Sequence, residues 1–183
     1  MALPPTIYRV SIQLADLDRN CYEQLQFTVA RHPSETAERL VARLLAYALC
    51  QEEGLAFTKG IGAGDEPDLW AKGPDGRVRL WVEVGLPDPE RLLRAVRHAE
   101  QVALFASGGN RWRWEKEHLP RLTGIANLTV YGLAGDFLQQ IADPLQRAIA
   151  WSLTVTEGNL YLTVGETTLE APLTVLAAAE PGR

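Results

Sequence analysis

The chain has 183 residues, with 18 basic and 23 acidic side chains and a net charge of −5. Its hydrophobic fraction of 46% excludes a mainly disordered chain, and no apolar run approaches the roughly 20 residues that span a bilayer. The net acidity excludes a global positive field that would concentrate nucleic acid. With two cysteines and a start unlike a secretory signal, we expect one soluble domain, residues 1–183, in a reducing cytoplasm and without a membrane partner.

Alternating and helical patterns predict the elements of the first half of the chain. Two strands alternate apolar and polar residues over 7–14 and 24–29. A helix follows, with its entry at Pro33, its cap at Ser34 and its end at Gly54. The next predicted elements are strands at 55–59, 66–72 and 77–84, with a glycine-rich loop at 60–65 and a turn at 73–76.

The second half of the chain alternates predicted helices and strands. Asp88 and Pro89 open a helix that runs to residue 99. A later hairpin turns at Glu157 and Gly158. The remaining elements are a strand at 102–106, a helix at 110–119, a strand at 125–131, a helix at 136–145 and an extended stretch at 168–176. This order predicts an α/β fold in which helices flank one mixed β-sheet.

Two neighbouring predicted strands each carry an acid, Asp68 and Glu83, inside an apolar run. Because burying an ionised carboxylate alone costs several kcal/mol, each acid should find a cation, a strong donor or a proton. The turn between the strands sets Asp68 opposite Trp81, or opposite Glu83 after a shift of two residues. In either register the two acids share a face as direct or diagonal neighbours.

These carboxylates form a candidate metal site. Glu66 lies on the same strand face, and Glu38 falls in the apolar arc of the first predicted helix, opposite Arg43. Clustered carboxylates bind Mg²⁺ or Mn²⁺, which lowers the pKa of a bound water and offsets charge on a phosphodiester. The alternative is a buried salt bridge with Lys59, Lys72 or an arginine of the second helix.

Several segments resemble the YaeQ family of bacterial proteins and, more broadly, the PD-(D/E)XK nuclease superfamily. They are TIYRVSIQLADLDRN, ARHPSETAERL, EPDLW, LWVEVGLPD, VALF and ANLTVYGL. The resemblance implies a restriction-endonuclease-like αβββαβ core with additional N- and C-terminal strands. It also implies a metal site built from Asp68 and Glu83, with the Val84 carbonyl as a further ligand and Glu38 as the first-helix acid.

The lysine of the superfamily pattern is absent, because Gly85 stands two residues after the second acid. In such nucleases that lysine holds the attacking water and counters transition-state charge, so another cation must replace it. Arg91, Arg94 and His98 form one helical stripe, and Arg94 is the first substitute, with Arg91 and Lys72 as auxiliary candidates. Arginine supplies charge but is no base, so activation of the water would depend on the metal.

Residues 91–121 hold seven basic and three acidic residues, an excess of positive charge in an acidic chain. Within this segment Arg97, Arg111 and Arg113 are candidate contacts to nucleic acid, against the alternative of an ordinary solvated helix face. Trp112 and Trp114 lie about 200° apart on a helix, so at least one should pack on the sheet.

The sequence leaves two functions open. The first is a Mg²⁺- or Mn²⁺-dependent phosphodiester hydrolase of nuclease type, in which Asp68 and Glu83 bind the metal and Arg94 stabilises charge. The second is a catalytically inactive binding or regulatory module on the same fold, which the missing lysine favours.

Overall fold

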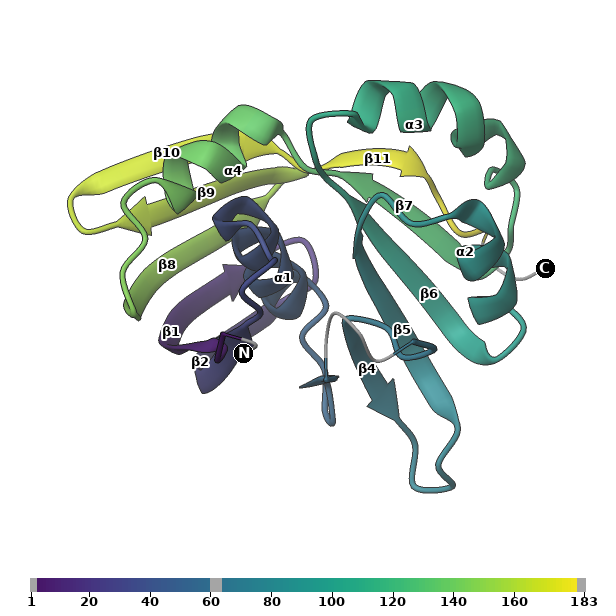
Figure 1. The fold of residues 1–183 in the computed structure, drawn as a ribbon, viewed down its shortest axis with the longest axis horizontal. Coiled ribbons are helices and arrows are strands. Elements are labelled where there is room, and N and C mark those ends of the chain that lie inside the picture. Colours follow the sequence, from purple (N-terminus) through teal and green to yellow (C-terminus); the bar gives the residue numbers. More distant parts are fainter. Residues whose placement is uncertain (1–2, 60–63, 181–183) are drawn as a thin grey trace. The chain divides into compact units, whose positions relative to one another are not determined.

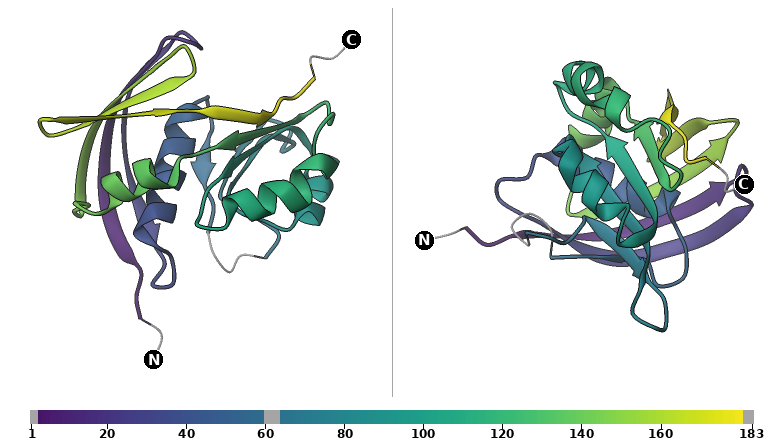
Figure 2. Two further views of the ribbon diagram at one scale, coloured as in Figure 1. Left: turned by 90° about the horizontal axis from the view of Figure 1, so that it is seen from above. Right: turned by 90° about the vertical axis from the view of Figure 1, so that its right-hand side faces the viewer.

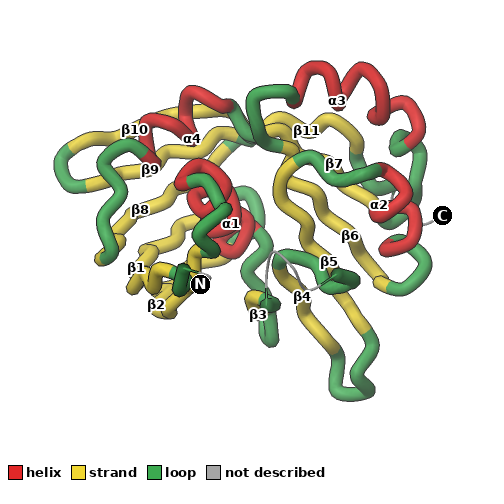
Figure 3. The backbone as a smooth tube through the Cα atoms, viewed as in Figure 1, coloured by secondary structure: helices red, strands yellow, loops and turns green. Residues whose placement is uncertain are grey.

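The computed structural model describes residues 3–59 and 64–180, so most of the predicted glycine-rich loop lies outside the described residues. The chain forms two compact units, Met1–Gln51 with Ala134–Leu173 and Glu52–Leu133 with Thr174–Arg183 (Figure 1). Each unit has its own sheet, and both sheets combine parallel and antiparallel strands (Figure 3). The α/β class is therefore confirmed, whereas the expectation of one sheet is wrong. The single domain expected from the sequence stays a prediction.

The sheet of the first unit has five strands in the order β10-β9-β8-β1-β2. Its two longest strands form the predicted antiparallel hairpin and lie side by side (Figure 2). Period-two alternation directs Val10, Ile12 and Leu14 into the core of this unit. The strands are β1 (Thr6–Asp16), β2 (Cys21–Arg31), β8 (Ala148–Thr156), β9 (Asn159–Val164) and β10 (Thr167–Pro172).

Two helices of the first unit, α1 (Ala37–Leu49) and α4 (Gly135–Ala142), pack against each other. The cap of α1 is Thr36, whose hydroxyl accepts the backbone N–H of Arg39 at 3.1 Å. The expectation of a cap at Ser34 is wrong, because its hydroxyl lies 2.6 Å from Nδ1 of His32.

The sheet of the second unit has six strands in the order β11-β7-β6-β5-β4-β3, and β5, β6 and β7 are parallel. The extended stretch predicted at 168–176 divides between the two sheets, since β10 ends at Pro172 and the next strand begins at Thr174. The strands are β3 (Ala56–Phe57), β4 (Leu69–Lys72), β5 (Val78–Gly85), β6 (Ala99–Ala106), β7 (Leu128–Gly132) and β11 (Thr174–Ala177).

Helices α2 (Pro89–Ala95) and α3 (Arg111–His118) cover one face of the second sheet (Figure 2). A 3-10 turn, Leu119–Arg121, follows α3. Trp114 is buried in this core and its Nε1 donates to the Pro87 carbonyl at 2.8 Å, whereas the side of α3 that carries Trp112 is exposed. The expectation that one of the two tryptophans packs on the sheet is confirmed.

The pairing of β4 with β5 fixes how the two central acids meet. Leu69 pairs with Val82, and a bulge between Ala71 and Lys72 changes the register nearer the turn. Asp68, one step beyond Leu69, therefore lies beside Glu83. This is the shifted register of the two alternatives, and the bulge explains why counting from the turn alone did not decide between them.

Over residues 3–59 and 64–180, no helix is both long enough and apolar enough to cross a membrane.

Candidate functional site

Asp68 immediately precedes β4 and is only 5% exposed. Its backbone N–H donates to the Val82 carbonyl at 3.0 Å, and its Oδ2 accepts the Val84 N–H at 2.8 Å. The carboxylate therefore continues the contact between the two strands beyond their last paired residues. A backbone donor of this kind stabilises the ionised form of a buried acid.

Glu83, on β5, is equally buried and is held by a cation from the following helix. Its Oε1 accepts hydrogen bonds from Nε of Arg91 at 2.7 Å and from Nε1 of Trp81 at 2.9 Å. Arg91 also donates through Nη1 to the Gly64 carbonyl at 2.7 Å and through Nη2 to the Glu66 carbonyl. The guanidinium thus links the acid to the segment before β4. It is the salt bridge with a second-helix arginine that the sequence left as an alternative.

The partners of Glu83 do not fully offset the effect of burial on its pKa. Burial raises the pKa of Glu83 above its usual value, and the nearby charge of Asp68 adds to the increase. The guanidinium of Arg91 and the indole N–H of Trp81 act in the opposite direction without cancelling it. Ionised Glu83 is therefore costly even with its arginine in place.

A divalent ion would compete with this arrangement. Among the residues that the structure describes, no group of three or more His, Cys, Asp or Glu side chains is placed to hold a metal. Mg²⁺ usually takes one or two carboxylates together with waters, but Oε1 of Glu83 already accepts two hydrogen bonds. A metal ion at Asp68 and Glu83 would therefore have to compete with Arg91 and Trp81 for Glu83, and the Mg²⁺ or Mn²⁺ site stays a prediction.

The other predicted site residues take different places. Glu66 provides its backbone carbonyl to Arg91, whereas the Nζ of Lys72 lies 3.8 Å from the centre of the Trp70 ring. The β-bulge before Lys72 explains why its even spacing from Asp68 did not predict this position. Glu38 is half-buried on α1, which belongs to the first unit, whereas Asp68 and Glu83 belong to the second unit. The role of Glu38 as a metal ligand stays a prediction.

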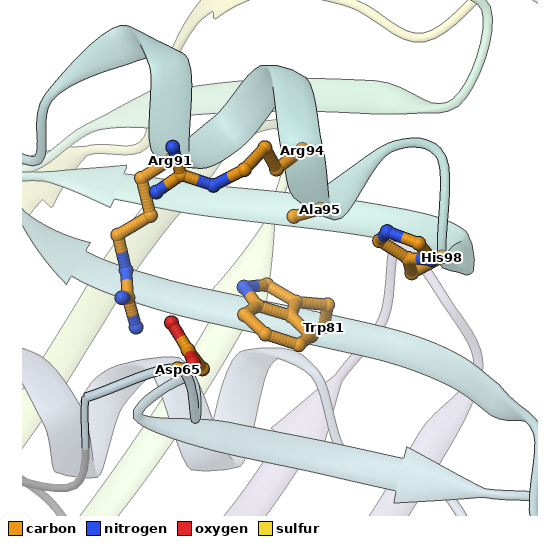
Figure 4. Close-up of a pocket in the computed structure, with 6 residues that line it drawn as sticks. All are labelled: Asp65, Trp81, Arg91, Arg94, Ala95 and His98. Atoms are coloured by element: carbon orange, nitrogen blue, oxygen red, sulfur yellow. The ribbon is translucent and has the colours of Figure 1, made fainter.

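A pocket of about 310 Å³ lies beside the ion pair (Figure 4). Trp81 crosses its middle, Arg94 extends above it from α2, and His98 and Asp65 lie at opposite ends. Arg94 therefore lines the pocket, but Arg91 is the arginine that reaches Glu83. Trp81 was not among the predicted site residues. Its position two residues before Glu83 places both side chains on one strand face, and this spacing could have identified it.

Comparison with known proteins places this chain in a family. The family model described as YaeQ protein matches residues 1–173. This chain belongs to the YaeQ family. Proteins described as "Uncharacterized protein YaeQ" from Salmonella typhi and Escherichia coli K12 are 39% and 37% identical over 175 residues, which cover 95% of this chain and 97% of each relative.

Crystal structures of YaeQ proteins share the two-sheet α/β fold. The protein from Pseudomonas syringae matches with a TM-score of 0.91 and 39% identity, covering 98% of this chain and 100% of that one. The protein from Xanthomonas axonopodis pv. citri matches with a TM-score of 0.91 and 31% identity, covering 95% and 99%.

In this YaeQ family member, the three arginines predicted to contact nucleic acid differ in their surroundings. Arg111 donates to the Leu133 carbonyl at 3.1 Å, and a Cβ added at Gly132 would lie 2.3 Å from its Nη1. This arginine therefore packs closely against β7 and secures α3. Arg97 and Arg113 are exposed, and their contact with nucleic acid stays a prediction.

Proposed function

We propose that this chain binds nucleic acid without hydrolysing it, on a PD-(D/E)XK-like second unit in which Arg91 takes the place of a divalent ion. The observation that carries the proposal is the contact of the Arg91 guanidinium with Glu83 at 2.7 Å. The order β4, β5, α2, β6 supplies the strand and helix part of the core that the sequence resemblance implies.

The pair of Arg91 and Glu83 explains the absence of catalysis in this proposal. A metal ion lowers the pKa of a bound water and produces hydroxide, whereas a guanidinium stays protonated and offers only charge and hydrogen bonds. Gly85 has no side chain at the position where the superfamily carries its lysine. Neither route to an activated water is therefore present around Asp68 and Glu83.

The exposed side of α2 supports the binding half of the proposal. Arg94 on α2 is exposed, as are Arg97 and His98 in the turn that follows it, and the arginine fork matches the oxygens of a phosphate. Because the whole chain has a net charge of −5, attraction must be local. Binding through a few phosphate contacts falls as salt screens and competes with them.

The proposal is tested with labelled single- and double-stranded DNA and RNA, by fluorescence anisotropy at about 50 mM and about 200 mM salt. We expect binding that weakens with salt, and intact strands after incubation with Mg²⁺ or Mn²⁺. Arg94→Ala should weaken binding, and Arg147→Ala, at an exposed arginine of the first unit, serves as the control. Metal-dependent cleavage that disappears in Asp68→Ala would contradict the proposal.

A metal-dependent hydrolase is the second candidate. The raised pKa of Glu83 next to a second buried acid favours it, because a dication would stabilise both carboxylates. This candidate requires Arg91 to leave when the metal enters. Arg91→Met should then tighten Mn²⁺ binding in calorimetry, whereas Arg97→Met, in the turn after α2 and outside the pocket, should not. Equal Mn²⁺ binding by the two variants would exclude this candidate.

A further inference from the structure

The pocket beside Arg91 combines an aromatic surface, two arginines, a histidine and a carboxylate in a small volume. Its lining residues all belong to the second unit and come from β5, from α2 with the segment after it, and from the segment before β4. A volume of about 310 Å³ is at the lower end of the range for small-ligand sites, so it suits one compact ligand and not a length of strand.

Trp81 is an aromatic platform with a fixed orientation. Its Nε1 donates to Glu83 at 2.9 Å, and its ring meets that of Trp70 edge-on, with centroids 6.4 Å apart and planes at 69°. These two contacts leave the half-buried indole without freedom to turn when a ligand arrives. A flat ring that stacks on such a platform loses little to ordering of the protein.

Arg94 and His98, both exposed on or just after α2, also line the pocket (Figure 4). Within residues 3–59 and 64–180, the guanidinium of Arg94 makes no hydrogen bond or ion pair. It is therefore available to a ligand, unlike that of Arg91, which is bound to Glu83 and to two carbonyls. An arginine fork matches two oxygens of a phosphate monoester, and an imidazole can add a hydrogen bond to it.

Asp65 lies at the end of the pocket opposite His98 (Figure 4). A carboxylate repels phosphate but accepts hydrogen bonds from amino and hydroxyl groups. The two ends of the pocket therefore favour different parts of one ligand, with the anionic group toward the imidazole and neutral donors toward the acid.

We propose that this pocket binds a single nucleoside 5′-monophosphate unit. The base stacks on Trp81, Arg94 and His98 hold the phosphate, and Asp65 accepts an amino or hydroxyl group of the ligand. The unit has two sources, a free mononucleotide or the 5′-phosphorylated end of a strand. The second source rests on the proposed nucleic-acid binding and gives it a specific contact.

The first experiment measures binding of AMP, adenosine and inorganic phosphate to the full chain by calorimetry. Because stacking and phosphate contacts add in one ligand, we expect AMP to bind at least about tenfold more tightly than adenosine or phosphate. AMP that binds no more tightly than inorganic phosphate would overturn the proposal.

Matched variants separate the contacts. Arg94→Ala should weaken AMP at least about tenfold and leave adenosine unchanged, whereas Arg147→Ala, at an exposed arginine of the first unit, should change AMP by less than about twofold. Trp81→Phe keeps a stacking ring and loses the bond to Glu83, so it should retain AMP binding, and Trp81→Leu should lose about tenfold. Equal losses in the two arginine variants, or in the two Trp81 variants, would contradict the assignment.

The final experiment compares an oligonucleotide with a 5′-phosphate and the same strand with a 5′-hydroxyl. Tighter binding of the phosphorylated strand that is lost in Arg94→Ala supports the strand end as the source. If AMP binds and neither strand does, the pocket is a free-nucleotide site. The proposed nucleic-acid binding is then contradicted, and the pocket assignment stands. If both strands bind and AMP does not, the pocket assignment fails and strand binding stands.

Discussion

The two units each contain a buried glutamate paired with an arginine eight residues later in the chain. In the first unit, Nε of Arg43 donates to Oε1 of Glu35 at 2.8 Å, and in the second unit Nε of Arg91 donates to Oε1 of Glu83 at 2.7 Å. The same atoms thus meet at nearly the same distance in both units. The environments of the two pairs nevertheless give them different consequences.

The pair in the first unit is closed. Arg43 has a side chain only 4% exposed, and its Nη2 bonds both Oε2 of Glu35 and the Ala30 carbonyl. The side chain of Arg91 is 25% exposed and lines a pocket, and its glutamate lies beside a second acid. The same ion-pair geometry thus closes the core where it is sealed, and borders an accessible pocket where it is open.

The largest expected effect comes from breaking the sealed pair. Arg43→Met should lower the free energy of unfolding by about 4 kcal/mol, because it leaves the buried carboxylate of Glu35 without its buried cation, next to the partly exposed Arg39. Urea unfolding measures this loss. Arg39→Met, which removes the 3.1 Å contact of this partly exposed arginine with the same carboxylate, is the control and should cost less. A smaller loss in Arg43→Met than in the control would contradict the comparison.

The next effect comes from breaking the open pair. Arg91→Met should cost about 2 kcal/mol, less than the sealed pair, because water already reaches the guanidinium and can solvate the acid that remains. Adding Glu83→Gln should recover part of the loss by removing the unpaired charge. The comparison fails if Arg91→Met unfolds at lower urea concentration than Arg43→Met.

A smaller effect tests the raised pKa of Glu83. A carboxyl whose pKa is raised in the folded state contributes stability below its ordinary pKa, and this contribution is lost as pH rises through the raised value. Glu83→Gln removes that loss and should therefore raise the melting temperature by about 3 °C near neutral pH. The gain should shrink toward about pH 5, as thermal melts across that range would show. A lower melting temperature at neutral pH would show that the ion pair outweighs desolvation.

The smallest effect is expected for an exposed pair. Nε of Arg113 lies 3.5 Å from Oε1 of Glu117, one turn apart on α3, and both side chains are more than half exposed. Arg113→Ala should change the free energy of unfolding by less than about 0.5 kcal/mol. A loss as large as that of Arg91→Met would show that burial does not determine how much each of these ion pairs contributes to stability.

Local sequence patterns predicted the positions of helices and strands better than they predicted which strands pair. The β1–β2 hairpin and the turn at 73–76 follow from alternation and turn chemistry, and the Asp88 cap is confirmed by its 2.8 Å bond to the Glu90 N–H. The division of the stretch 168–176 was not predictable, because period-two alternation does not say which of two sheets a strand joins.

The site was predicted as a set of residues but not as a set of contacts. Arg91 and Arg94 share a helix face, and the choice between them depends on where the crossover from β5 to β6 places the first turn of α2. Arg43 was placed opposite the buried arc, and this interpretation is wrong. Its partner Glu35 precedes the helix, so helical spacing gave no sign of their pairing.

We infer that Arg91, and not a metal ion, neutralises Glu83. Calorimetric titration of Mn²⁺ into the wild-type chain and into the double variant Asp68→Ala, Glu83→Ala tests this inference. We expect the same weak, unsaturable heats for both proteins. Stoichiometric binding by the wild type that disappears in the double variant would contradict it.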